Sequence, residues 1–180
     1  VRFGRDGASY TSRYVETSRY LQEAAAGKAV FGKIADLAGF SGLAMMILNA
    51  ARGWCGVIDR SKGEGNANTS LIYHAGRLLA LQEADRPYGV RVLCDGVMET
   101  IGEAAFNGKT VTPFTAHPKL HPGTGYLHAF SYGYEKFPKS DVTLHSVSPD
   151  GRLERSSEIT GLGGASMMHD FAITNDYAVF

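Results

Sequence analysis

Hydrophobic and polar residues alternate with a period of two along most of this chain. The alternating runs are short, and turn sequences such as Ala-Gly at 75–76, Asn-Gly at 107–108 and Pro-Asp-Gly at 149–151 separate them. This pattern predicts β-strands joined by hairpins. Strands so short, with turn signals about every eight to twelve residues, are typical of a sandwich, a barrel or a propeller, and the period does not choose among these folds. The predicted strands lie within residues 1–20, 69–74, 77–81, 88–93, 97–106, 111–116, 126–134, 142–148, 152–159, 167–173 and 177–180.

One segment, from about residue 34 to residue 55, follows the helical period instead. Its apolar side chains recur three and four positions apart and form one face, which predicts an amphipathic helix packed on a core. The apolar stretch is shorter than the roughly 20 residues that cross a bilayer, although a helix lying in a membrane surface fits the same pattern. The face consists of Leu43, Met46, Ile47, Ala50, Ala51 and Trp54.

The composition is that of a globular, β-rich domain. The 180 residues include 22 glycines and 9 each of Tyr and Phe, and 18 basic side chains balance 18 acidic ones. Glycines suit frequent turns and aromatic residues suit strands, whereas a zero net charge gives no reason to expect a nucleic-acid partner. Cys55 and Cys94 form no CxxC pair, which favours free thiols and a reducing compartment.

The two ends of the chain lie inside strand-like stretches. The sequence begins at Val1, without a methionine, and stops at Phe180. A terminal strand of this kind would leave an edge without a partner, so we expect the chain to be a piece of a longer protein. Targeting therefore stays open, because a leader peptide would precede Val1.

Two of the six histidines, His117 and His169, lie at the ends of apolar, strand-like runs. They are 52 positions apart, close to the length of a four-stranded propeller blade, which is about 40–50 residues. Equivalent strands of successive blades face one central axis, so these two side chains could meet there. Taken singly, each histidine is more often a hydrogen-bonded or surface residue than a ligand.

Four blocks of the sequence, in order, resemble signature segments of the carotenoid cleavage dioxygenases. They are AVFGKIADLAGFSGLAMMILNAARGWCGVID at 29–59, GNANTSLIYHAGRLLALQEADRPYGVRV at 65–92, FTAHPKLHPGTGYLHAFSY at 114–132 and MMHDFAITNDYAVF at 167–180. The first is similar to the helical insertion of the plant branch of that family.

This resemblance implies an all-β fold, part of a seven-bladed β-propeller with a helical cap. Residues 1–180 would form a partial propeller domain that does not close, with the helical insertion at about 34–55. The resemblance also implies that the helical segment makes peripheral contact with a membrane, and this replaces core packing as our expectation for its apolar face.

The resemblance further implies an Fe²⁺ site that four histidines hold on the propeller axis. Carried over by motif, the histidine of AHPK is His117 and that of MMHDF is His169. The glutamate of LQEAD, Glu83, matches a carboxylate that hydrogen-bonds to a ligand, and it is expected to orient His169. By itself Glu83 is typical of a solvated turn residue.

The family's other two ligands lie beyond Phe180, so we expect the isolated chain to be inactive. The remaining histidines match none of the ligand motifs and are expected to be structural or surface residues. These are His74, His121, His128 and His145.

The implied reaction is the cleavage, by O2, of a conjugated double bond of a carotenoid or apocarotenoid, which gives aldehydes or ketones. LIYHAGRLLAL, EADRPY and FTAHPK are nearer to the branch that cleaves the 9,10 bond than to the 9-cis-epoxycarotenoid branch, which cleaves at 11,12 and stays an alternative. An alternative of another class is a propeller that has lost its metal and serves as a binding module, although Glu83, His117 and His169 argue against it. Plastid and cytoplasm both stay open as locations.

Overall fold

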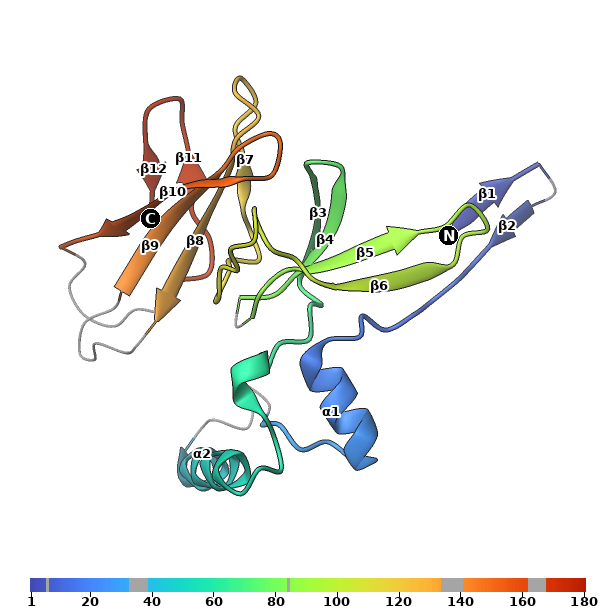
Figure 1. Cartoon of the computed structure of the whole chain (residues 1–180), viewed down its shortest axis with the longest axis vertical. Coiled ribbons are helices and arrows are strands. Elements are labelled where there is room, and N and C mark those ends of the chain that lie inside the picture. Colours follow the sequence, from blue (N-terminus) through green and yellow to red (C-terminus); the bar gives the residue numbers. More distant parts are fainter. Residues whose placement is uncertain (6, 33–38, 84, 134–140, 162–167) are drawn as a thin grey trace.

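The computed structural model describes residues 1–5, 7–32, 39–83, 85–133, 141–161 and 168–180. Two four-stranded antiparallel sheets form most of it, and Figure 1 shows them side by side. The first sheet has the order β3-β4-β5-β6 and the second the order β10-β9-β8-β7, so each follows the chain from strand to neighbouring strand. Such meanders are the form of a propeller blade. Among the described residues the two sheets do not close into a ring.

In the two sheets, the bounds of seven strands follow the predicted strands closely, whereas the strand at 119–120 was not predicted. Of the strand predicted at 167–173, only Ala172–Ile173 is a strand among the described residues. The first sheet contains β3 (Ser70–His74), β4 (Arg77–Leu81), β5 (Tyr88–Val92) and β6 (Met98–Glu103). The second contains β7 (Lys119–Leu120), β8 (Leu127–Gly133), β9 (Asp141–Val147) and β10 (Leu153–Ile159). Two short hairpins are β1 (Arg2–Gly4) with β2 (Gly7–Ser9), and β11 (Ala172–Ile173) with β12 (Ala178–Val179). The helices are α1 (Ser18–Ala26) and α2 (Gly39–Trp54), and a 3₁₀ turn covers Arg60–Lys62.

The hairpin predicted at residues 75–76 is confirmed. Ala75 and Gly76 join β3 to β4 with φ values of 50° and 73°. Positive φ at both central residues is the geometry of the two-residue turn that matches the twist of the flanking strands. The pairing Ser70 with Leu81 through His74 with Arg77 then follows without a bulge.

The prediction of strand throughout residues 1–20 is wrong. Only β1 and β2 are strands there, and α1 begins at Ser18. The side chain of Thr17 caps this helix by accepting a hydrogen bond from the Tyr20 amide at 3.1 Å, and Gly27 ends it in the left-handed conformation with φ 65°. These are ordinary start and stop signals, but the loose alternation before Thr17 obscured them.

The prediction of a strand at 111–116 is also wrong. This segment crosses from the first sheet to the second. The Phe114 amide donates to the carbonyl of Asp85, in the loop between β4 and β5, at 3.0 Å, while the Thr115 amide donates to the Phe130 carbonyl of β8 at 2.9 Å. Because successive amides bond to a loop and to a strand, no continuous ladder forms, and the segment stays extended without being a strand.

The largest apolar core lies between the two sheets and encloses this crossing segment. Strands of both sheets and the connection between them contribute its fully buried side chains, and the Phe106 and Phe114 rings stack there at a centroid distance of 5.6 Å. A second core covers the opposite face of the second sheet, where Phe130, Val142 and Phe171 pack together. The members of the first core are Leu79, Leu81, Ala104, Phe106, Val111, Phe114, Ala116, Leu127, Ala129 and Val147.

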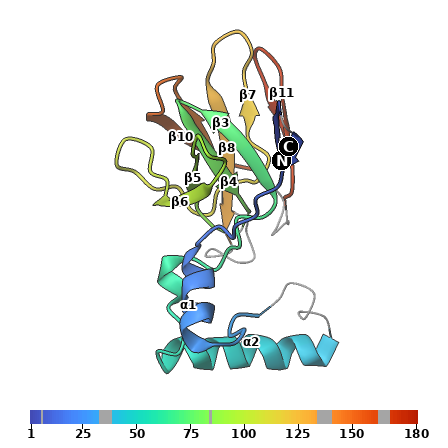
Figure 2. The same cartoon turned by 90° about the vertical axis from the view of Figure 1, so that its right-hand side faces the viewer.

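Helix α2 covers the central part of the predicted helical segment, and residues 34–38 lie outside the described residues. Figure 2 shows both helices at one end of the molecule, away from the sheets. The predicted apolar face is exposed, with Ile47 at 62% and Trp54 at 92%, so it does not pack in a core of this chain. The other side holds the helix, where Arg52 donates to the Val30 carbonyl at 2.7 Å. No described helix is long and apolar enough to span a bilayer.

Four histidines outside the candidate site have local structural contacts, and two of them, His74 and His145, are buried. The ring of His145 has hydrogen-bond partners on both sides. It bridges three strands of the second sheet, with Nε2 at 2.8 Å from the Ser131 hydroxyl and Nδ1 at 2.9 Å from the Ser156 hydroxyl. His74 is also buried, and its Nε2 lies 2.8 Å from the Ser148 carbonyl. Burial lowers the pKa of His145 below its ordinary value of 6.5.

This pKa shift predicts a specific pH dependence of stability. The unfolded chain takes up a proton on His145 at a higher pH than the folded protein does. The stability from the neutral ring is therefore fully present above pH 6.5 and declines as the pH falls toward the lower pKa of the folded state. We expect urea unfolding of the full-length protein between about pH 7 and pH 5 to show a shallower decline in His145→Gln than in the wild type. Parallel declines in the two proteins would contradict this account of His145.

Candidate metal centre

Three side chains from distant parts of the chain converge beside the two sheets. They are Glu83, in the loop after β4, His117, just before β7, and His169, just before β11. One potential ligand atom of each lies within 4.8 Å of the others. The two imidazole rings meet edge to face, with centroids 4.6 Å apart and an interplanar angle of 68°. The structure thus brings together all three residues that the sequence predicted for the site.

The Glu83 carboxylate lies between the two rings and is closer to one of them. Its Oε1 lies 2.6 Å from His169 Nδ1 and 4.0 Å from His117 Nε2. Glu83 is partly buried, whereas the His169 side chain is 71% exposed. The carboxylate is therefore placed to hold the exposed ring from one side, at its Nδ1 nitrogen.

The loop that carries Glu83 is anchored by the buried carboxylate of Asp85. Its Oδ2 accepts a hydrogen bond from the Gly65 amide at 3.0 Å and its Oδ1 one from the Arg86 amide at 2.8 Å. The carbonyl of Asp85 accepts from Phe114, three residues before His117. Asp85 is 1% exposed, and this burial raises the pKa of its carboxyl group. One residue therefore links the Glu83 loop to the segment that carries His117.

Two hydroxyl groups bond to the backbone at His117 and at the residue before it. The Ser70 hydroxyl of β3 donates to the carbonyl of Ala116. The hydroxyl of Thr115, which is buried, accepts from the His117 amide at 3.1 Å. Irregular backbone inside a protein needs such partners, because its amides and carbonyls have none in a ladder. They hold the segment between the sheets and direct the ring toward Glu83.

His169 depends on the neighbouring Phe171 for its placement. Phe171 is buried against Phe130 of β8, with the two rings edge to face at 5.4 Å. This packing attaches the start of the β11–β12 hairpin to the second sheet. His169 itself stays exposed, and its described contacts with the site come from Glu83 and His117.

One atom of the cluster indicates that a cation fits there. His117 Nε2 is shielded from solvent and has no hydrogen-bond partner among the described residues, and Glu83 Oε1 lies 4.0 Å from it. Buried polar atoms are almost always paired, so this nitrogen indicates a missing ligand. Imidazole nitrogens suit first-row transition metals, and a carboxylate on the far ring nitrogen fixes the tautomer of a ligand. The donor set therefore fits a transition-metal ion.

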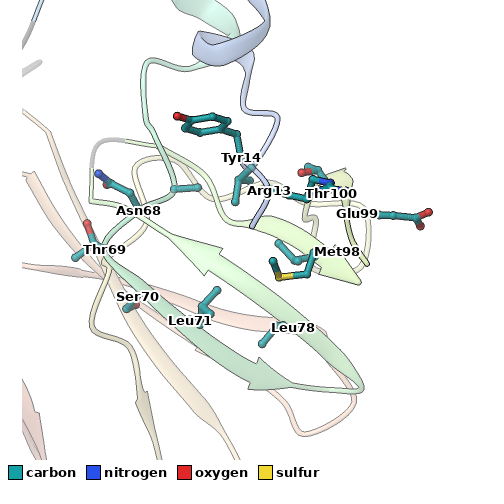
Figure 3. A pocket seen from close by; sticks show the side chains of 13 residues that line it. Arg13, Tyr14, Asn68, Thr69, Ser70, Leu71, Leu78, Met98, Glu99 and Thr100 are labelled. Carbon is teal, nitrogen blue, oxygen red and sulfur yellow. The ribbon is translucent and has the colours of Figure 1, made fainter. Parts of the chain in front are cut away.

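An open pocket of the described structure lies elsewhere. It has a volume of about 530 Å³ between the segment 13–15 and the first sheet, and Figure 3 shows Tyr14 above Leu71, Leu78 and Met98. None of its lining residues belongs to the cluster of Glu83, His117 and His169. Its size alone does not make it a reaction site, because it brings no group of potential metal ligands together.

Sequence reasoning missed the residues that place the three side chains. Asp85 follows Glu83 closely in an acidic turn, and a charged residue there is typical of a solvated loop. Ser70 and Thr115 lie in runs that alternation describes only as strand. The partners of Asp85 and Ser70 are distant along the chain, at Gly65, Phe114 and Ala116, and no local pattern carries that information. Thr115 bonds locally, to the His117 amide.

Comparison with known proteins relates the whole chain to one family. The family model described as retinal pigment epithelial membrane protein matches residues 1–180. A carotenoid 9,10(9′,10′)-cleavage dioxygenase of Arabidopsis thaliana is 46% identical over 180 residues, which are 100% of this chain and 33% of that protein. A chloroplastic 9-cis-epoxycarotenoid dioxygenase of the same plant is 41% identical over 99% of this chain and 31% of its own length. The chain thus spans about a third of the length of the curated relatives it matches.

Solved structures of two oxygenases are also similar to this chain. The lignostilbene dioxygenase of Pseudomonas brassicacearum matches with a TM-score of 0.68 and 34% identity, over 91% of this chain and 30% of that one. The cobalt-substituted apocarotenoid oxygenase of Synechocystis matches with a TM-score of 0.65 and 30% identity, over 92% of this chain and 33% of that one. The second comparison is to a protein in which a metal has been exchanged.

The anchoring by Asp85 predicts that Gly65 accepts no side chain. A Cβ at this position would lie 2.4 Å from Asp85 Cβ and 2.5 Å from Gln82 Oε1. We expect Gly65→Ala to lower the free energy of unfolding of the full-length protein by about 1–3 kcal/mol, as overpacking does, and to weaken metal binding by displacing the Glu83 loop.

Gly133→Ala is the matched control, because no atom of the described residues lies within 4 Å of a Cβ added there. Urea unfolding and metal titration of the two variants measure the difference. Equal stability and equal metal affinity in Gly65→Ala and Gly133→Ala would show that the Asp85 contact does not position the loop.

Proposed function

Because this chain belongs to the family of carotenoid oxygenases, we propose that the full-length protein is an iron-dependent dioxygenase that cleaves a conjugated double bond of a carotenoid. The observation that carries this proposal is the convergence of Glu83, His117 and His169 on one point beside the two sheets. Three residues separated by up to 86 positions meet there, and the buried Nε2 of His117 has no hydrogen-bond partner among the described residues.

The fold supports a site on the axis of a propeller. The carotenoid oxygenase fold of the solved relatives is a β-propeller, and the two four-stranded meanders have the form of two of its blades. We propose that the complete protein has seven blades and that segments outside this chain close the ring. His117 and His169 then face the axis from neighbouring blades.

The proposed metal is Fe²⁺, held by His117, His169 and two further histidines outside this chain. Glu83 is assigned to orienting His169 and not to direct ligation. Its Oε1 is closer to His169 Nδ1, at 2.6 Å, than to His117 Nε2, at 4.0 Å. A carboxylate on Nδ1 holds the proton there and leaves Nε2 free to bind a metal, as in other carboxylate–histidine–metal arrangements.

The protein residues supply positioning and control of protonation. Four neutral imidazoles leave the charge of the ion uncompensated by a direct carboxylate, and Glu83 compensates part of it from a distance. When bound, the ferrous ion supplies the place where dioxygen reacts. The backbone contacts of Asp85, Ser70 and Thr115 keep the Glu83 loop and His117 in place, so that the ligands need little rearrangement.

We propose the 9,10 double bond as the cleavage position. The identity of 46% to a 9,10(9′,10′)-cleavage dioxygenase, against 41% to a 9-cis-epoxycarotenoid dioxygenase, supports this choice. Incubation of the full-length protein with a carotenoid and O2, followed by mass spectrometry of the products, distinguishes cleavage at 9,10 from cleavage at 11,12. Only products of 11,12 cleavage would transfer the assignment to the epoxycarotenoid branch.

The metal site itself predicts the effect of three substitutions in the full-length protein. His117→Ala and His169→Ala should each abolish iron binding and carotenoid cleavage, because each removes a ligand. Glu83→Gln should weaken iron affinity about 10–100-fold, the usual effect of removing a group that orients a ligand. Iron content and product formation measure these changes.

His121→Ala is the control, because the hydrogen bonds that its ring accepts among the described residues come from the amides of its own turn, at Gly123 and Thr124. It should retain both iron and activity. Full activity of His169→Ala would refute the assignment, and a wild-type protein that binds no metal would favour a non-catalytic binding module.

We also propose that the exposed face of α2 contacts a membrane, where carotenoids dissolve. Its large apolar side chains point away from the rest of the chain, and the most exposed are Phe40 at 94% and Trp54 at 92%. A short amphipathic helix of this kind lies in the interface of a bilayer without crossing it. The helix would bring the protein to the phase that holds its substrate.

This membrane contact predicts that Phe40→Ser combined with Trp54→Ser weakens binding to phosphatidylcholine vesicles. Burial of each large apolar side chain stabilises binding by about 1.5–3 kcal/mol, so a loss of at least about tenfold is expected. Phe3→Ser, at a residue of β1 that is 83% exposed, is the matched control. Co-sedimentation of the full-length variants measures the effect, and equal binding of all three proteins would contradict the proposed contact.

A further inference from the structure

We propose that the ion pair between Lys119 and Asp170 is a positioning element of the metal centre. Lys119 Nζ lies 2.6 Å from Asp170 Oδ1. Lys119 follows His117 by two residues, and Asp170 comes directly after His169. The pair therefore joins the two ligand-bearing segments next to their ligands. This inference rests on the proposed metal site and assigns to it two residues outside the ligands and Glu83.

Lys119 is the partner whose backbone belongs to a strand. It begins β7 and is paired with His128 of β8, so its backbone belongs to the second sheet. Its side chain is 30% exposed, and Nζ lies 5.8 Å from the centroid of the Phe171 ring. The ammonium group thus reaches across the edge of the sheet toward the residues that follow His169.

Asp170 lies in the segment that the ion pair attaches to the sheet. Residues 168–171 belong to no strand, because β11 begins at Ala172. Within the described part of the chain, no backbone–backbone hydrogen bond ties these four residues to another segment. Asp170 Oδ1 accepts from the Phe171 amide at 2.7 Å as well as contacting Lys119. One carboxylate oxygen therefore fixes the local backbone and attaches it to β7.

Apolar packing holds the backbone on both sides of His169. Met168 and Phe171 both pack on the core of the second sheet, but no described residue of the segment that carries His117 belongs to that core. The ion pair adds a direct link to that segment, one residue from His169. This link restricts the separation of the two imidazoles, and a ligand pair held near its binding separation loses less freedom on binding a metal.

The expected effect is smaller than that of Glu83, which touches a ligand directly. An ion pair at this exposure, 30% for Lys119 and 51% for Asp170, changes an equilibrium by up to about fivefold. Lys119→Met and Asp170→Asn in the full-length protein should each raise the dissociation constant for Fe²⁺ about two- to fivefold. The double variant should be no weaker than either single one, because both substitutions remove the same interaction.

Anaerobic titration with Fe²⁺ gives the dissociation constant, and three further readouts separate positioning from general stability. The free energy of unfolding of the metal-free protein in urea should change little between the wild type and the variants. Lys119→Arg keeps the charge and should keep most of the affinity. The difference between the wild type and Asp170→Asn should shrink in about 1 M salt, where charges on the surface are screened within about 3 Å.

Arg152→Met is the matched control. It breaks the exposed pair of Arg152 with Asp150, whose atoms are 2.9 Å apart in the turn between β9 and β10, but it touches neither ligand segment. Wild-type affinity in both Lys119→Met and Asp170→Asn, or the same loss in Arg152→Met, would overturn the inference and leave the proposed function intact. A wild-type protein without affinity for Fe²⁺ would overturn the proposed metal site and this inference with it.

Discussion

Burial of apolar side chains between the two four-stranded sheets is the constraint on which the candidate site depends. The segment that leads to His117 runs through this core, where Phe114 and Ala116 are fully buried. The loop that carries Glu83 follows a core strand and is bonded to the same segment through Asp85. Loss of this core would leave both side chains on unconnected loops. The site is therefore a consequence of how two sheets pack, with polar anchors at the places where backbone leaves a ladder.

Much of the fold was predictable from alternation, because seven of the eight strands of the two sheets have runs of period two that end at clear turns. The failures have physical causes. Residues 111–116 alternate like a strand, yet their successive amides bond to the β4–β5 loop and to β8. The helix after Thr17 is short and follows an extended stretch. For α2 the period predicted an amphipathic helix correctly, but a period does not state what covers the apolar face, and in this chain that face is exposed.

The candidate ligands were predictable from motifs, whereas their support was not. His117 and His169 lie in segments that resemble a known family, and Glu83 lies in a third such segment. The residues that hold these side chains act over long distances in the sequence, as Ser70 does at Ala116 and Lys119 at Asp170. Such contacts depend on how the sheets come together. They follow from the tertiary structure, and local sequence propensity does not predict them.

The assignment of roles within the cluster has one direct test, which is the location of the metal in crystals of the full-length protein. Anomalous diffraction at the iron absorption edge would show where the ion lies relative to each side chain. This account predicts one strong peak within bonding distance of a ring nitrogen of both His117 and His169, with Glu83 bonded to His169 Nδ1 and not to the metal. A peak bound directly by the Glu83 carboxylate, or one away from both rings, would contradict it.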